Sequence, residues 1–175
     1  MQNSNDGLFN SFLNSEETLW VCRGDQIIFQ SQKGGIAPLI EYIQKHGFSA
    51  DEVTVCDRVV GNAAALLLKT ACSNMVYSAV GSEIALKTLE KLSIPGFFIK
   101  VVPYIINRKG DGMCPFEKAS IGKSPDEFFE YLKRTSPIWL IHEMEFSYYG
   151  RHHLSEDRRK HGRSPYLAPF SSGTA

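Results

Sequence analysis

Apolar runs of strand length alternate with helix-length segments across the middle of this chain. The runs Val53–Val60, Met75–Val80 and Phe97–Ile106 are rich in Val, Ile, Phe and Tyr, which favour β-structure. The intervening segments 62–72 and 82–92 carry their apolar residues at helical spacing. Strands that are joined by helices of this length form parallel β-α-β units with right-handed crossovers. The alternation therefore predicts an α/β protein built around parallel strands.

A β-hairpin is predicted before this alternation. Leu19–Cys22 and Gln26–Gln30 are short apolar runs on either side of a turn at Gly24-Asp25. The two strands of a hairpin are antiparallel, so the complete sheet is predicted to be mixed. Pro103 lies within the last apolar run of the chain. Because proline lacks a main-chain N–H, that run is predicted to be an edge strand or a bent one.

Changes in composition divide the chain into four segments. Residues 1–18 form an N-terminal extension, whose apolar spacing fits either a short docking helix or a frayed terminus. Residues 19–123 form the α/β domain. Residues 124–149 are predicted to be a helical extension that begins at Ser124-Pro125-Asp126. Residues 150–175 are basic and then rich in Pro, Ser and Gly, which is typical of a partly flexible tail.

The balance of charges and the cysteine usage exclude several classes of partner. The 175 residues include 19 basic and 19 acidic ones, so no overall field attracts nucleic acid or an anionic membrane. No apolar run approaches the ~20 residues that cross a bilayer, and the N-terminus lacks the pattern of a signal peptide. The four cysteines contain no Cys-x-x-Cys pair, which is typical of reduced thiols. We therefore expect a cytoplasmic protein without a membrane or nucleic-acid partner.

A polar cluster lies where the strand Val53–Val60 passes into the next helix. Asp57, Arg58, Gly61 and Asn62 fall at this junction. Free main-chain N–H groups at a helix start favour an anion or a carbonyl oxygen, and glycine lets a ligand approach the main chain closely. Asp and Asn also cap helices and close turns. Capping residues outnumber ligand-binding residues at such junctions, so this cluster taken alone favours a capping role.

A second polar cluster runs from Asn107 and Arg108 to Cys114 and Glu117. Pro115 suits the first position of a helix, and Glu117 would lie in its first turn. A thiol at a helix start can be activated as a nucleophile, so Cys114 is the candidate catalytic residue. However, Glu117 adds negative charge beside it, and no histidine is near in sequence to act as a base. A structural cysteine is the simpler interpretation.

No pattern in the chain predicts a metal site or a cofactor. The pairs His142-Glu143 and His152-His153 lack the spacing of zinc ligands. Gly110-Asp111-Gly112 lacks the third glycine of a dinucleotide-binding loop. The chain also has no Walker loop and no Gly-x-Ser-x-Gly elbow. We interpret the histidines and arginines of the C-terminal segment as surface residues or as part of a homo-oligomer interface.

Three motifs, taken together, resemble a known family. They are Lys33–Leu39, Asp57–Ala64 and Asn107–Glu117. They resemble a small bacterial and archaeal family of unknown function whose members have a cytidine-deaminase-like fold, and the resemblance covers about residues 19–122. It implies a three-layer α/β/α sandwich with a mixed sheet that opens with the hairpin.

The same resemblance implies that the zinc chemistry of deaminases is absent. Zinc deaminases need His or Cys and then Glu at the first helix start, and Pro-Cys-x-x-Cys at the second. The triplet Gly61-Asn62-Ala63 and the segment Met113–Glu117 stand at these positions. One thiolate and one carboxylate remain, without a third protein ligand or a proton-shuttling glutamate. Hydrolytic deamination is therefore not expected.

In such a fold the two helix starts face each other across the carboxyl ends of the strands, where open α/β sheets bind ligands. The predicted pocket residues are Asp57, Arg58, Gly61, Asn62, Asn107, Arg108, Cys114 and Glu117. The leading hypothesis is a small polar ligand of nucleotide or nucleobase type. Asn62 and Asn107 would bind it through hydrogen bonds, and Arg108 would meet an anionic or carbonyl group. Two alternatives stay open, namely an enzyme that depends on Cys114, and a structural or oligomeric interaction module.

Overall fold

The computed structural model describes residues 4–46 and 52–135 of the chain. All of the described residues fall within one compact unit. The predicted tail, residues 150–175, and most of the predicted helical extension, residues 124–149, lie outside the described residues. The division of the chain into four segments therefore stays a prediction.

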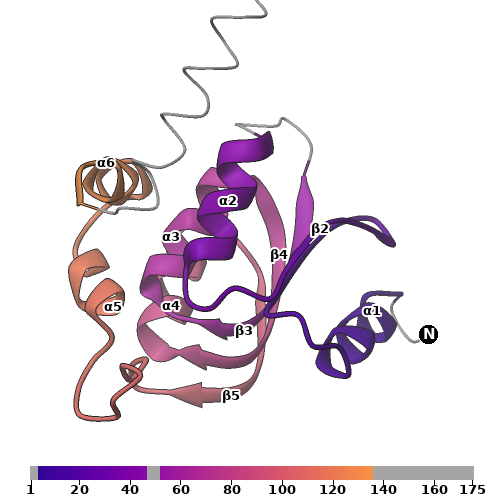
Figure 1. Cartoon of the computed structure of the whole chain (residues 1–175), viewed down its shortest axis with the longest axis horizontal. Helices are drawn as coiled ribbons and strands as arrows, with labels where there is room; N and C mark the ends of the chain where they lie inside the picture. Colours follow the sequence, from indigo (N-terminus) through magenta and orange to yellow (C-terminus); the bar gives the residue numbers. More distant parts are fainter. Residues whose placement is uncertain (1–3, 47–51, 136–175) are drawn as a thin grey trace, which may run out of the picture. The chain divides into compact units, whose positions relative to one another are not determined.

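The centre of the fold is a mixed sheet of five strands in the order β2-β1-β3-β4-β5 (Figure 1). Strand β1 pairs antiparallel with β2 and with β3, whereas β3, β4 and β5 are parallel. The strands are β1 (Leu19–Arg23), β2 (Gln26–Ser31), β3 (Val53–Val60), β4 (Ser73–Ser82) and β5 (Gly96–Val102). The prediction of an α/β protein with a mixed sheet that opens with a hairpin is confirmed.

Two strand boundaries differ from the predicted ones for identifiable reasons. Strand β4 extends to Ser73 and Ser82, because it lies inside the sheet and has a hydrogen-bonded neighbour on each side. Strand β5 is an edge strand that ends at Val102 instead of Ile106. Pro103 follows directly and cannot donate a main-chain hydrogen bond, so the ladder stops there.

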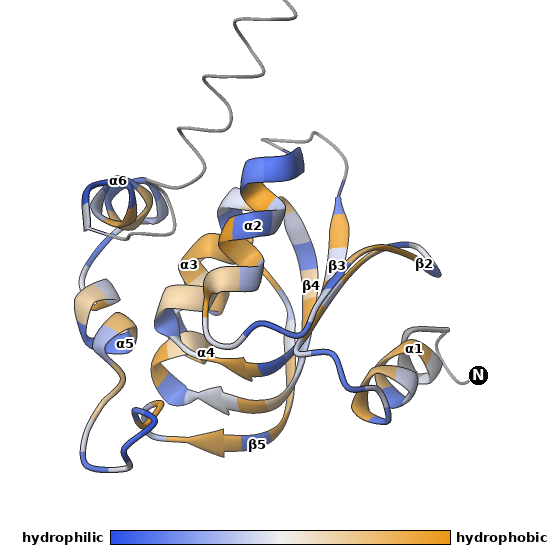
Figure 2. Cartoon of the chain, viewed as in Figure 1, coloured by the Kyte–Doolittle hydropathy of each residue, from blue (hydrophilic) through white to orange (hydrophobic). Residues whose placement is uncertain are grey.

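Six helices lie among the described residues. One of them, α3 (Asn62–Thr70), is central, and α2, α4, α5 and α6 pack against it. Every residue of α3 except Lys69 is buried, and Figure 2 shows that most of its length is apolar. Val21, Val55 and Val76 lie in register on β1, β3 and β4 and support these helices from the sheet. The helices are α1 (Ser4–Leu13), α2 (Ala37–His46), α3 (Asn62–Thr70), α4 (Glu83–Lys91), α5 (Pro115–Ser120) and α6 (Pro125–Thr135).

Helix α1 packs against the other face of the sheet (Figure 1). Its Phe9 and Phe12 are buried against Trp20 and Tyr77, with the Phe12 and Trp20 ring centroids 5.5 Å apart. Side chains alternate across a strand, so Trp20 and Tyr77 point away from the face that α3 covers. Of the two alternatives for the N-terminal segment, the structure has the docked helix.

Candidate functional site

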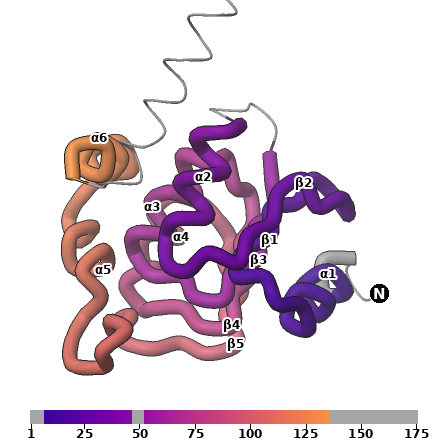
Figure 3. The backbone as a smooth tube through the Cα atoms, in the orientation of Figure 1, coloured from indigo at the N-terminus to yellow at the C-terminus, as the bar shows by residue number. Residues whose placement is uncertain are grey.

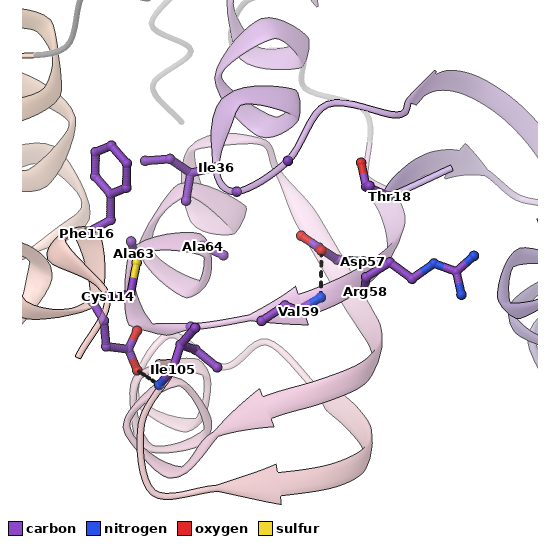
Figure 4. Close-up of a pocket in the computed structure, with 14 residues that line it drawn as sticks. Thr18, Ile36, Asp57, Arg58, Val59, Ala63, Ala64, Ile105, Cys114 and Phe116 are labelled. Carbon is purple, nitrogen blue, oxygen red and sulfur yellow. Dashed lines mark hydrogen bonds between the residues drawn. The ribbon is translucent and has the colours of Figure 1, made fainter. Parts of the chain in front are cut away.

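A pocket of about 250 Å³ lies where β3 ends and α3 begins (Figure 4). The chain reverses there from a parallel strand into a helix, which leaves a crevice beyond the carboxyl end of the strand. Fourteen residues from four parts of the chain line it: Thr18, Gly34, Gly35, Ile36, Asp57, Arg58, Val59, Gly61, Ala63, Ala64, Ile105, Cys114, Phe116 and Glu117. Of the predicted pocket residues, Asp57, Arg58, Gly61, Cys114 and Glu117 are among them.

Two glycines allow the main chain to form the walls of this pocket. Gly61 precedes α3, and a Cβ atom there would come within 2.9 Å of Ile105 Cγ1 and closer still to Glu117 Oε2. Gly35, in the loop before α2, has a φ of +69°, which side chains rarely adopt. Glycine is thus favoured at position 61 by the lack of space for a Cβ atom and at position 35 by the positive φ.

Asp57 is an acidic side chain in the wall of the pocket. Its carboxyl is buried, with 8% of the residue exposed, and Figure 4 shows it pointing toward the side where Ile36 and Ala64 lie. Burial raises its pKa to about 7, and main-chain N–H groups of Val59 and Arg58 partly oppose this rise. The Val59 N–H donates to Oδ1 at 3.0 Å. A carboxyl that titrates near neutral pH inside a cavity can accept or donate a proton.

Arg58 points to the opposite face of the sheet from Asp57, because successive side chains of a strand alternate (Figure 4). Its guanidinium donates to the main-chain carbonyls of Phe12, Leu13, Ser15 and Glu17, at 2.5–3.0 Å. The guanidinium carbon also lies 4.7 Å from the centre of the Phe12 ring. Arg58 thus holds the end of α1, and only its main chain remains at the pocket.

Glu117 is buried between two helix starts. Its residue is 1% exposed, and its Oε2 accepts the Asn62 N–H at 2.5 Å, at the first position of α3. Its Oε1 accepts the Ile105 N–H at 3.4 Å. A carboxylate at this position satisfies a free N–H of α3 and interacts favourably with the helix dipole. The helix start that could bind an anion is therefore occupied by the protein's own carboxylate.

Asn62 connects three helices and does not line the pocket. Its Nδ2 donates to Ser120 Oγ of α5 at 2.9 Å, and its Oδ1 accepts from Thr88 Oγ1 of α4 at 2.5 Å. The residue is 3% exposed. The predicted role of Asn62 in binding a ligand through hydrogen bonds is thus replaced in this structure by contacts within the protein.

The loop that contains Asn107 and Arg108 lies at the rim of the pocket. The Asn107 Nδ2 donates to Asp111 Oδ1 at 2.7 Å, and its Oδ1 accepts the main-chain N–H groups of Lys109 and Asp111. These hydrogen bonds close the turn that follows β5. The path of the backbone through this turn can be traced in Figure 3. The Arg108 guanidinium lies over Gly34, where an added Cβ would be 2.7 Å from Nη2. Neither side chain is part of the pocket wall.

Cys114 lines the pocket on the side opposite Asp57, and it is half-buried (Figure 4). Its N–H donates to the Ile105 carbonyl at 2.8 Å, and α5 begins directly after it with Pro115. The predicted helix start after Cys114 is present. Within the ranges 4–46 and 52–135, no three His, Cys, Asp or Glu side chains gather in a way that could hold a metal ion.

Several wall residues were missed by reasoning from the sequence. Thr18 was not assigned, and Gly34, Gly35, Ile36 and Phe116 were noted within the motifs Lys33–Leu39 and Asn107–Glu117 without a role in the pocket. Two consecutive glycines directly before a helix were the signal that could have identified this wall, because such a loop can approach a ligand closely.

The fold and the pocket define an α/β domain with a ligand-sized cavity at the carboxyl end of a central parallel strand. The sequence profile of the domain of unknown function DUF1893 matches residues 9–135, and the chain belongs to this family. The structure is similar to the crystal structure of a DUF1893 family protein, TM1506, from Thermotoga maritima. The TM-score is 0.68 and the identity 26%, over 75% of this chain and 89% of the other.

No curated protein matches this chain. The comparisons thus confirm a family of unknown function with a bacterial relative. Within the part of the chain that the structure describes, no helix has the length and apolar character to span a membrane.

Proposed function

We propose that the pocket binds a small polar ligand of nucleobase or nucleotide type, on a cytidine-deaminase-like domain without zinc chemistry. The observation that carries this proposal is the buried Asp57 carboxyl, which lies at the pocket wall among Ile36, Val59 and Ala64. Ligand sites are typically apolar cavities with a few fixed polar groups, often with a shifted pKa. Burying a group of this kind costs stability, and such costs are typical of functional sites.

The size of the pocket restricts the ligand. At about 250 Å³ it is slightly smaller than the roughly 300–1,000 Å³ of drug-sized sites. A single heterocyclic ring fits this space, and any sugar or phosphate would lie toward the rim. Arg108, which lies over Gly34, is placed to meet such a group.

The absence of zinc chemistry is supported by the bonds that Glu117 makes. Gly61 and Ala63 offer no metal ligand at the start of α3. At the second helix start, both carboxylate oxygens of Glu117 accept main-chain N–H groups, from Asn62 and Ile105. The carboxylate acts there as a helix cap, which fits a binding domain better than a hydrolase.

A thermal-shift screen of nucleobases, nucleosides and nucleotides tests the proposal. A ligand at 100 times its Kd stabilises the folded state by roughly 2.7 kcal/mol, which gives a readily measured rise in Tm. We expect at least one heterocycle to raise the Tm of the wild-type protein, and Asp57→Asn to abolish that rise. If no compound in the panel changes the Tm, the proposal is wrong.

Catalysis at Cys114 is a second candidate, and it is favoured by the position of the thiol in the same pocket as Asp57. Burial raises the pKa of Cys22 to about 11 and that of Cys56 to about 12, so these two thiols should react slowly. Iodoacetamide labelling of a Cys72→Ser variant at pH 7 therefore reports on Cys114. Labelling that is faster than that of a free thiol supports this candidate, and slow labelling removes it.

A further inference from the structure

Asp57 is the charged side chain through which the pocket acts on a ligand. Three lining residues carry charged side chains, namely Asp57, Arg58 and Glu117. The Arg58 guanidinium is bound to carbonyls on the α1 side of the sheet. Both oxygens of Glu117 accept main-chain N–H groups. The cavity therefore presents one carboxyl group to a ligand, and its lining supplies no cationic side chain to neutralise that group.

Resting on the proposed function, we infer that the pocket selects flat ligands that present two adjacent N–H donors, of the amidine or aminopyrimidine type. Such a ligand edge pairs with the two oxygens of the Asp57 carboxylate. The same geometry rejects a ligand whose charge inside the pocket is negative.

The physical reason is the low dielectric around Asp57. A buried carboxylate without a partner is costly, and a planar pair of N–H donors satisfies both oxygens at once in a bidentate contact. Oδ1 already accepts the Val59 N–H at 3.0 Å, and a carboxylate oxygen has room for a second donor. A second negative charge would instead be repelled across a short distance. The two carboxylate oxygens of Asp57 thus select a ligand both by its charge and by the geometry of its N–H donors.

The remaining walls favour a flat ring. Ile36, Val59, Ala64 and Phe116 supply apolar surface to the pocket wall. Such surface stabilises the faces of an aromatic ring through burial, while its polar edge pairs with Asp57.

Three probes of one shape test the inference: benzamidinium, benzamide and benzoate, which differ mainly in charge and in N–H donors. Binding to the full-length protein is measured by calorimetry at pH 8.5. We expect benzamidinium to bind about tenfold or more tightly than benzamide, and benzoate to show no binding, since a charge-assisted hydrogen bond contributes about 1.5–3 kcal/mol. Asp57→Asn should remove the preference, whereas Asp126→Asn, at an exposed position of α6, should retain it.

The pH dependence supplies a second readout. The charged or titratable groups near Asp57 include Glu117 and Cys114 in the pocket wall and Arg108 over Gly34, with Cys56 and Arg58 on the far face. Benzamidinium stays protonated from pH 5.5 to 8.5, so its affinity should rise through about pH 7 as Asp57 ionises. Asp57→Asn should remove this rise, and a rise that persists in the variant would assign it to another group.

The outcomes separate this inference from the proposed function. If nucleobases raise the Tm but benzoate binds as tightly as benzamidinium, the donor selectivity is wrong and the binding function stands. If nucleobases bind but none of the three probes does, the selectivity is again wrong, because the probes share the required size. If neither the nucleobases nor the probes bind, both proposals fail.

Discussion

Asp57 holds its carboxyl group where desolvation opposes the charged form. The pKa of an exposed aspartate is ~3.9, whereas burial raises that of Asp57 to about 7. Between these two pH values the folded state keeps the proton and the unfolded state has released it. The free energy of unfolding therefore falls as the pH rises from about 4 to about 7, and this contribution is constant above about 7. The pocket is thus built at a cost in stability at neutral pH.

Asp57→Asn should stabilise the protein at pH 8. Each pKa unit corresponds to about 1.4 kcal/mol, so the variant should gain a few kcal/mol in the free energy of unfolding relative to the wild type. The gain should disappear toward pH 4. Urea unfolding at several pH values measures both effects, with Asp126→Asn as the exposed control. Equal pH dependence in Asp57→Asn and the wild type would contradict the buried, shifted carboxyl.

Glu117→Gln should destabilise the start of α3. The two oxygens of Glu117 accept the N–H groups of Asn62 and Ile105, and an amide offers only one oxygen. One buried N–H would then face a donor, at a cost of about 1–3 kcal/mol. Thermal or chemical unfolding measures the loss. Glu90→Gln, at an exposed position of α4, serves as the matched control and should change stability by less than about 0.5 kcal/mol. A similar change in both variants would show that Glu117 is not a cap.

At the scale of single residues, reasoning from the sequence predicted positions better than roles. It placed Asp57 and Glu117 at the candidate site, because Asp57 lies near the junction of a strand and a helix and Glu117 lies in the first turn of a helix. It did not predict that Glu117 caps α3, since that contact joins residues 55 positions apart. Nor could it show that Asn62 contacts Ser120 and Thr88, because such partners depend on how the helices pack.

Helix α1 and strand β3 are joined by one side chain. Arg58 donates to four carbonyls, those of Phe12 and Leu13 in the last turn of α1 and those of Ser15 and Glu17 just after it. Because Asp57 and Arg58 are neighbours on β3, one residue shapes the pocket while the next fixes α1 on the opposite face. The planar guanidinium has five N–H donors spread over three nitrogens, whereas lysine has three donors on a single nitrogen.

Arg58→Lys should loosen α1 without unfolding the sheet. We expect the main-chain amides of residues 7–13 to exchange hydrogen at least about tenfold faster, because several charge-assisted hydrogen bonds are lost. The amides of β4 should keep their protection. Hydrogen exchange followed by mass spectrometry measures both regions, and Arg134→Lys on the exposed end of α6 is the control. Unchanged exchange in α1 would contradict the role of Arg58.

At the scale of elements, periodicity predicted most of the fold. The strand Val53–Val60 has the bounds that were predicted, because apolar β-branched residues fill a central strand. The helix that begins at Pro125 and its buried Phe128, Phe129 and Leu132 also agree with the apolar spacing. The helical alternative for the first residues could not be chosen from the sequence, since the aromatic partners of α1 come from β1 and β4. Local patterns carry no information on such distant contacts.

The whole chain continues beyond the residues that the family profile matches, which end at 135. We expect residues 150–175 to carry a homo-oligomer interface, because this segment gathers histidines and arginines. Removing them should then lower the sedimentation coefficient by more than the lost mass explains. Analytical ultracentrifugation of the full and shortened chains decides the matter. A decrease that the lost mass accounts for would contradict an interface in this segment.

For the molecule as a whole, the central claim is that the pocket between β3, α3 and α5 binds a nucleobase-like ligand at Asp57. Gly34, Gly35 and Gly61 line that pocket, so their main-chain amide signals in NMR spectra should report on its occupancy. In a titration of the labelled protein with nucleobases and nucleosides, we predict saturable shifts of these three signals, which Asp57→Asn abolishes. If no compound in the panel shifts them, or if the shifts persist unchanged in Asp57→Asn, the claim is wrong.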